Sequence, residues 1–196
     1  MEFDSEIDGI SKYLMDKQDA FNAAMGISRN IIMEAGRIIT MLHNNDMAEA
    51  KKKFALLSNE VRKLGSTGAG FEYHTLQAYQ EYAEAAIMLA IKSSGKIPSI
   101  SKVHVQKDAY LFGLMDAVGE LKREVLEALR RDDTKNAEKF FDLMNKIYDS
   151  TRRLRFAEAI LPGFRRKQDT ARIQLENAGS EIVMFKNAHS HRGLQA

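Results

Sequence analysis

The stretch LQAYQEYAEAAIMLAI, residues 76–91, places two acidic side chains near the start of an otherwise apolar helix. Glu81 and Glu84 lie one helical turn apart, and no lysine or arginine occurs between Lys63 and Lys92. After Glu84 the stretch is entirely Ala, Ile, Met and Leu, so this part of the helix is expected to be buried. A buried charge must be paired, must bind a metal ion or must take up a proton. The local sequence leaves open which of the three holds these carboxylates.

A second helix, expected at about 108–131, carries a similar acidic ridge opposite its apolar face. The ridge consists of Asp116, Glu120 and Glu127. Asp116 and Glu120 form a like-charge pair at i, i+4, which costs roughly 0.2–0.5 kcal/mol in an isolated helix. Small residues flank the ridge and would let another helix approach closely: Gly113, Ala117 and Gly119.

The rest of the chain also reads as helical. Its only two prolines, Pro98 and Pro162, lie where helical patterns break. We expect six helices, at about 5–43, 47–64, 71–92, 109–131, 134–161 and 162–185. The connection 93–107 is the longest irregular one, and its Val-His-Val could form a short extended piece. These features predict a single all-α, bundle-like domain of six to seven helices over residues 1–196, with a frayed tail from about 187.

Composition excludes several classes of protein. The 196 residues include no cysteine, which excludes disulfides, zinc–thiolate sites and thiol nucleophiles. The first residues are acidic and lack the pattern of a signal peptide, and the apolar run ending at Lys92 is too short to cross a membrane. We therefore expect a soluble cytoplasmic protein without a membrane partner. The net charge of +2 is too small to identify a partner by itself.

Two helices that each offer unpaired carboxylates favour a shared site. Facing one another, Glu81, Glu84, Asp116 and Glu120 would bind one or two hard divalent cations, Mg²⁺ or Mn²⁺, through oxygen. Such ions serve phosphoryl chemistry. Ion pairs elsewhere in the fold are an equally supported alternative, and a solvated polar face would explain the two acids of the second helix on its own.

Other helical sites are excluded by their motifs. No histidine follows a glutamate by three residues, as the di-iron bundle signature needs, and neither HExxH nor a Gly-Lys-Ser/Thr phosphate loop is present. The all-α nucleoside triphosphate pyrophosphohydrolases pair Glu-x-x-Glu with a later Glu-x-x-Asp. Glu81 and Glu84 fit the first half, whereas Asp116-x-x-x-Glu120 has the wrong order and spacing, so the match to these enzymes is partial.

Several segments resemble, in the same order, the translin family and within it most closely translin-associated factor X (TRAX). They are SRNIIMEAGRIITMLH (28–43), QEYAEA (80–85), AYLFGLMDAVGELKRE (109–124), IYDSTRRL (147–154) and LENAGSEI (175–182). The resemblance implies a seven-helix fold that assembles into hollow oligomers. It also implies a Mg²⁺-dependent endoribonuclease acting on single-stranded RNA, with Glu81, Glu84 and Asp116 as the catalytic and metal-binding acids and Glu120 beside them.

The sequence also departs from TRAX. Glu72-Tyr73 stands where TRAX has His-Arg, and the connection before the second acidic helix is short. We expect a compact member that works without a separate translin partner, as a homo-oligomer of six to eight subunits. The rival interpretation is a non-catalytic scaffold that binds single-stranded nucleic acid, as translin itself does. Translin lacks this acid set and the present chain keeps it, which favours an enzyme.

Contacts to nucleic acid are predicted at arginines. Arg165 and Arg166 lie in a dense basic segment, and Arg29 and Arg37 lie in the first matched segment. These arginines would bind the phosphates of the strand, and such binding weakens with added salt and does not depend on the nucleotide sequence. A solvated face or a subunit contact explains any one of these arginines equally well, and binding of single-stranded DNA is left open. His43 is expected to be a packing or hydrogen-bonding residue.

Overall fold

The computed structural model describes residues 2–192, and within this range the chain forms seven helices and no strand. The helices are α1 (Glu2–His43), α2 (Met47–Thr67), α3 (Glu72–Ser94), α4 (Ile100–Val103), α5 (Lys107–Arg130), α6 (Thr134–Thr151) and α7 (Phe164–Arg192). The prediction of an all-α fold with six to seven helices is confirmed.

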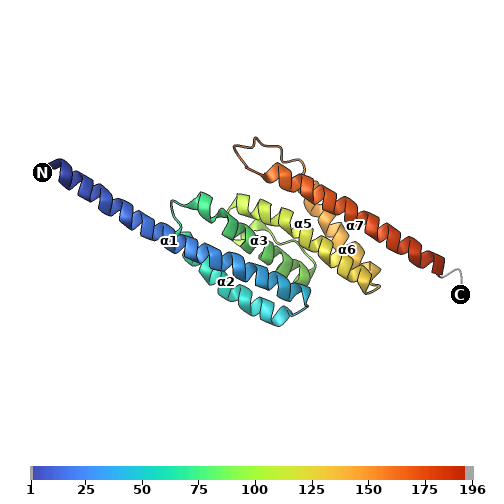
Figure 1. Ribbon diagram of the computed structural model, residues 1–196. Coiled ribbons are helices and arrows are strands. Elements are labelled where there is room, and N and C mark those ends of the chain that lie inside the picture. Colours follow the sequence, from blue (N-terminus) through green and yellow to red (C-terminus); the bar gives the residue numbers. More distant parts are fainter. Residues whose placement is uncertain (1, 193–196) are drawn as a thin grey trace.

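The helices α3 and α5 form the centre of the bundle (Figure 1). On one side, α1 packs against α3 and makes an antiparallel hairpin with α2, while on the other side α6 and α7 pack against α5 and against each other. The predicted burial of the second half of α3 is confirmed, because Ile87 and Met88 are fully buried and Ile91 is nearly so. The helices α3 and α5 therefore form the centre of the core, and their acidic turns lie among the packed helices of the bundle.

A glycine lets α3 and α5 approach each other closely. A Cβ atom added to Gly113 of α5 would lie 2.8 Å from the Cβ of Ala83 and 2.9 Å from the backbone nitrogen of Glu84. A Cβ added to Gly119 would lie 3.1 Å from the side-chain amide of Gln174 on α7. The prediction that small residues beside the acidic ridge admit neighbouring helices is confirmed at both glycines.

The fifth predicted helix ends earlier than expected. It was predicted to run to Leu161, but α6 ends at Thr151, and residues 152–163 form a loop before α7 begins at Phe164. The side-chain amide of Gln168 on α7 donates a hydrogen bond to the Thr151 carbonyl at 2.8 Å. This contact satisfies a carbonyl at the end of the helix and fixes where the chain turns away. A residue so distant along the chain leaves no local signal for the end of α6.

The connection before α5 contains a short helix, and the expected extended piece at Val-His-Val is wrong. Val103 closes α4, and His104 follows in the left-handed conformation with φ of 60°. The hydroxyl of Tyr110 donates to the carbonyl of Pro98 at 2.7 Å, which ties the connection to the start of α5. This segment supplies the seventh helix.

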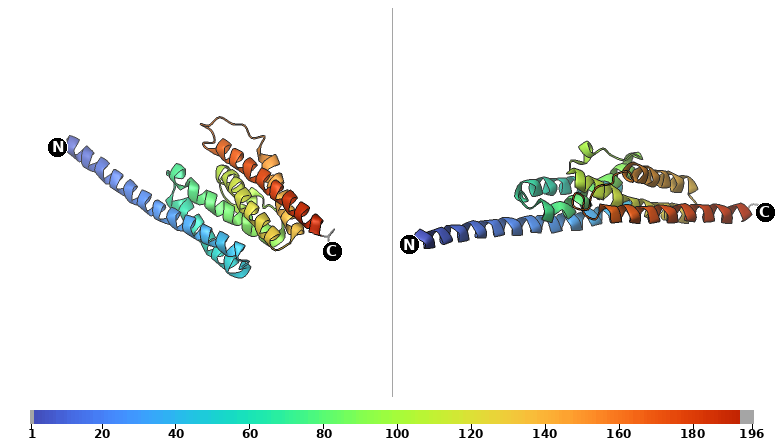
Figure 2. Two further views of the ribbon diagram at one scale, coloured as in Figure 1. Left: turned by 45° about the vertical axis from the view of Figure 1, so that its right-hand side comes forward. Right: turned by 90° about the horizontal axis from the view of Figure 1, so that it is seen from above.

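The two outer helices extend beyond the body of the bundle. The first half of α1 projects past the other helices in both views of Figure 2, and its residues 2–20 are all exposed. At the other end, α7 continues past the expected start of the frayed tail at 187 to Arg192. The remainder of that predicted tail, 193–196, lies outside the described residues. None of the described helices has the length and hydropathy needed to span a bilayer.

We predict that Gly113→Ala destabilises the protein. Alanine favours a helix over glycine by about 0.5–1 kcal/mol, but the new methyl group would overlap Ala83 and the backbone of α3. Overpacking of this kind lowers the free energy of unfolding by about 1–3 kcal/mol, which urea denaturation measures. The matched control is Gly36→Ala in α1, where nothing lies within 4 Å of the added carbon and the helix preference should raise stability. Equal effects of both substitutions would contradict the close crossing.

Candidate functional site

The crossing of α3 and α5 brings the four predicted acids together. Glu81 and Glu84 come from α3, while Asp116 and Glu120 come from α5. Both glutamates of α3 interact electrostatically with both acids of α5. These four side chains are named the acid cluster below. The two helices contribute one pair each because both pairs lie on the faces that meet at the glycine crossing.

Burial and mutual repulsion raise the pKa of both glutamates that α3 contributes to the acid cluster. Burial raises the pKa of Glu84 to about 8, and the charges of Asp116, Glu81 and Glu120 contribute to the same shift. Burial also raises the pKa of Glu81, with Asp116 as the next cause. A carboxylate with such a shift gains from any cation that enters beside it, because the cation replaces the proton.

A lysine from the far end of the chain supplies the cation that the sequence around α3 lacks. The Nζ of Lys167 on α7 lies 2.5 Å from Oδ1 of Asp116, and the side-chain amide of Gln80 donates to Oδ2 at 2.6 Å. The charge of Lys167 lowers the pKa of both Glu81 and Glu84, but not enough to offset burial and repulsion. Sequence reasoning missed this lysine, because only the packing of α7 on α5 brings it to the site.

A buried histidine holds the outer edge of the acid cluster. Nε2 of His43 lies 2.5 Å from Glu120, and its Nδ1 lies 2.7 Å from Glu124, which also accepts a hydrogen bond from Lys92 at 2.8 Å. Burial alone would lower the pKa of His43, but the two glutamates raise it above its ordinary value. Burial would raise the pKa of Glu124, but His43 and Lys92 lower it. The hydrogen-bonding role predicted for His43 is confirmed, whereas Glu124 and Lys92 were missed.

Only one of the four predicted arginines lies beside the acid cluster. Arg166 lines a hollow of about 460 Å³ together with Lys167 and the carboxylates of Glu84, Asp116 and Glu120. A phosphate entering this hollow would meet both cations of α7. Of the four arginines predicted to contact nucleic acid, Arg166 is therefore the one that the fold places at the candidate site.

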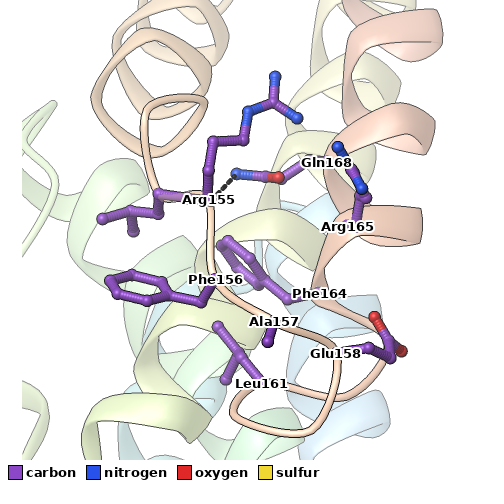
Figure 3. A pocket seen from close by; sticks show the side chains of 9 residues that line it. Arg155, Phe156, Ala157, Glu158, Leu161, Phe164, Arg165 and Gln168 are labelled. Atoms are coloured by element: carbon purple, nitrogen blue, oxygen red, sulfur yellow. Dashed lines mark hydrogen bonds between the residues drawn. The ribbon is translucent and has the colours of Figure 1, made fainter.

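The other predicted arginines lie elsewhere. Arg165 lines a separate hollow of about 280 Å³, where Arg155 comes from the loop and Arg165 from α7 (Figure 3). Arg29 is exposed on α1, and Arg37 on the same helix forms an ion pair with Glu34. These three predicted arginines are exposed, but they do not line the acidic hollow.

The donor chemistry of the acid cluster fits a hard divalent cation. Carboxylate oxygens are the ligands that Mg²⁺ and Mn²⁺ prefer, and Glu81 and Glu84, whose pKa values are raised first by burial and then by the charge of Asp116, would gain from a nearby cation. Within residues 2–192, no group of three or more His, Asp or Glu side chains is already arranged as metal ligands. In the arrangement described, the ammonium group of Lys167 lies against Asp116, where a metal ion would compete with it.

The sequence profile of the Translin family matches residues 24–179. The chain belongs to the Translin family. It is also 31% identical over 184 residues to uncharacterized protein MJ0175 of Methanocaldococcus jannaschii, with 92% of this chain and 82% of that protein covered. The matched range contains the acid cluster, His43 and Lys167.

Two solved structures share the fold. AfC3PO, in a structure described as its complex with duplex RNA, is 26% identical with a TM-score of 0.86, covering 93% of this chain and 97% of that one. Apo-NeC3PO is 20% identical with a TM-score of 0.84, covering 91% and 96%. The second likeness shows the fold alone. Together they confirm the translin-like arrangement expected from the sequence.

We predict that metal-free protein loses stability as pH rises from about 5 to about 8. The folded-state pKa of Glu84 is about 8, against an ordinary value of 4.5. The stability contributed by protonated Glu84 is therefore fully present below about pH 4.5 and is lost as pH rises towards and through 8. Glu84→Gln should therefore be more stable than wild type at about pH 8, and the difference should shrink towards pH 5. Thermal unfolding in chelator measures it.

The same experiment includes a matched control and a metal arm. Glu127→Gln removes a carboxylate from the exposed face of α5 and should not reproduce this pH dependence. Adding Mg²⁺ should stabilise wild type by mass action and Glu84→Gln much less. Identical melting temperatures for wild type and Glu84→Gln at both pH values would contradict the buried, repelling cluster.

Proposed function

We propose that this chain is a metal-dependent endoribonuclease that hydrolyses single-stranded RNA, and that it belongs with TRAX inside the Translin family. In this proposal Glu81, Glu84 and Asp116 hold Mg²⁺, with Mn²⁺ as a substitute, and Glu120 completes the site. The observation that carries the proposal is the acid cluster itself: four interacting carboxylates at the crossing of α3 and α5, where Lys167 of α7 pairs with Asp116.

The chain's own residues would divide the work at this site. A bound Mg²⁺ supplies an activated water and neutralises the charge that develops on a phosphate. Lys167 and Arg166 face the same hollow and would hold the phosphate of the strand. Gln80 fixes one oxygen of Asp116, and His43 fixes Glu120, so both carboxylates of α5 are oriented before substrate arrives. One carboxylate of the cluster would accept the proton of the water.

RNA is the substrate that the family favours. A solved structure at 26% identity is described as an AfC3PO–duplex RNA complex, which supports RNA binding by this chain. The proposal separates binding from cutting, because a duplex can be bound without its phosphates reaching the acid cluster. Flexible single strands can present one phosphate to the acidic hollow, whereas a stiff A-form duplex cannot deform as readily.

Two alternatives remain distinct from this proposal. A non-catalytic RNA-binding scaffold would use the arginines and leave the acid cluster as a structural feature. A nucleoside triphosphate pyrophosphohydrolase would need a Glu-x-x-Asp pair on the second acidic helix, which is α5 here. That helix instead has Asp116 and Glu120 at i, i+4. Membership of the Translin family favours the endoribonuclease and the RNA-binding scaffold over the pyrophosphohydrolase.

We predict that Glu81→Gln, Glu84→Gln and Asp116→Asn each lower cleavage of labelled single-stranded RNA by at least about 100-fold. Each change removes one ligand charge and leaves the cations of α7 in place, so RNA affinity measured in chelator should stay near that of wild type. The assay compares single-stranded and duplex RNA on metal-stripped protein, with and without added Mg²⁺.

Glu127→Gln is the control on the same helix, because this carboxylate lies outside the cluster and pairs with Arg130 and Arg131. It should cleave like wild type. Activity that persists in excess chelator would exclude the metal mechanism. Wild-type binding of RNA without any cleavage would favour the scaffold, and equal cutting of a long perfect duplex would remove the single-strand preference.

The projecting half of α1 supports assembly into a homo-oligomer. Its exposed apolar side chains recur at spacings of four, three and four residues: Phe3, Ile7, Ile10 and Leu14. This is the repeat of a helix that packs on another helix, and a continuous apolar stripe of this kind marks an interaction surface. We propose that a second copy of the chain covers it within a closed assembly of six to eight subunits.

We predict that Ile7→Glu combined with Ile10→Glu reduces the oligomer mass measured by light scattering, because the two charges would be buried at the subunit contact. Circular dichroism should show that the helical body is retained. Leu56→Glu on α2 is the matched control, since Leu56 is equally exposed but lies on the bundle body. A wild-type monomer with full activity, or a loss of mass with Leu56→Glu alone, would contradict this interface.

A further inference from the structure

A second hollow lies directly beside the acidic one, and we infer that it receives an unpaired nucleobase of the RNA strand next to the phosphate being cut. This hollow, named the base subsite here, has a volume of about 850 Å³, within the range of pockets that hold small organic ligands. The inference rests on the proposed function, because it assigns to that function the site for the neighbouring nucleotide.

The base subsite and the acidic hollow share one wall. Arg166 and Lys167 line both, so the pair of cations on α7 separates the two spaces. Gln80 lines the base subsite and donates its amide hydrogen bond to Asp116 of the acid cluster. A phosphate held at the shared cations would therefore have the carboxylates on one side and the base subsite on the other. In a nucleic-acid strand a base lies next to each phosphate, so one nucleotide could fill both spaces at once.

Aromatic side chains give the base subsite its stacking surface. Tyr73 is 82% exposed, an unusual exposure for a large aromatic residue. His74 meets the ring of Tyr73 edge-on at 5.6 Å and is itself braced by Phe21 at 5.3 Å. Phe112 lines the inner part, where Lys167 lies 5.7 Å from its ring centre. Tyr73 therefore presents an exposed ring, with His74 in edge contact beside it, on which a base can stack.

Apart from Arg166 and Lys167 of the shared wall, the polar groups of the base subsite fit a neutral base and not a second phosphate. Gln77, Gln80 and Gln106 bring amides that can donate to and accept from the edges of a base. Glu72 and Asp108 stand on the same wall, and backbone hydrogen bonds lower the pKa of Glu72, so it is charged near neutral pH. Negative charge there repels phosphate and tolerates an uncharged base.

The test is binding of RNA with one base missing. A set of labelled single strands of about 8 nucleotides, each with one abasic ribose at a different position, is titrated in chelator so that no strand is cut. For wild type, one abasic position should weaken binding by about 5- to 100-fold, the range expected for one stacked base. Tyr73→Ala should weaken the intact strand to a similar degree and remove the sensitivity to that position. Tyr73→Phe, which keeps the ring, should restore both.

The matched control is Phe156→Ala, which removes an exposed aromatic side chain from the separate hollow on the other side of α7's start. It should leave the abasic profile unchanged. If Phe156→Ala and not Tyr73→Ala removes the sensitive position, stacking lies in that other hollow and the base subsite is excluded. If the intact strand binds and Mg²⁺ permits cleavage while every abasic strand binds equally, the proposed function stands and the subsite is overturned. If no strand is bound, both fall together.

Discussion

The close crossing of α3 and α5 is the constraint on which the candidate site depends. Two helices can touch at Gly113 because that residue has no Cβ, and the atoms it meets belong to Ala83 and the backbone of Glu84. This contact brings the acids on the two helices near one another, and burial together with their mutual repulsion raises the pKa of Glu84.

The crossing gathers the acids of the candidate site, and their repulsion lowers the stability of the folded protein. An apolar pair of helices with the same glycine would pack as tightly and carry no repulsion, so the acid cluster lowers stability in the metal-free protein. The surroundings limit the loss without cancelling it. Lys167, which comes from α7, neutralises part of the negative charge of the cluster. At the outer edge, His43 and Lys92 offset the charges of Glu120 and Glu124. Among the described residues, the two acids on the α3 side have no such ion-pair partner and have raised pKa values, so they would gain most from a divalent cation.

The sequence could predict the acids but not their partners. Glu81 and Glu84 stand out because their helix is otherwise apolar, and Gly113 marks a close approach, since both signals are local. Lys167 lies on a helix whose register depends on how α7 packs, so no local pattern connects it to Asp116. The end of α6 likewise depends on a hydrogen bond from Gln168. Residues whose role depends on tertiary packing were missed, while those marked by an anomaly within one helix were found.

The position of Lys167 has a further consequence for how the site works. Its ammonium group lies against Asp116 in the cluster and also forms the wall shared with the base subsite. If the proposed Mg²⁺ bound at Asp116, it would compete with Lys167 for the same carboxylate, and the lysine would be free to turn towards the strand. A released lysine beside Arg166 would then face the phosphate that lies between acids and base. Under the proposed function, metal and RNA would bind cooperatively, because the metal would free the cation that the phosphate needs, and each would raise the other's affinity by the same factor.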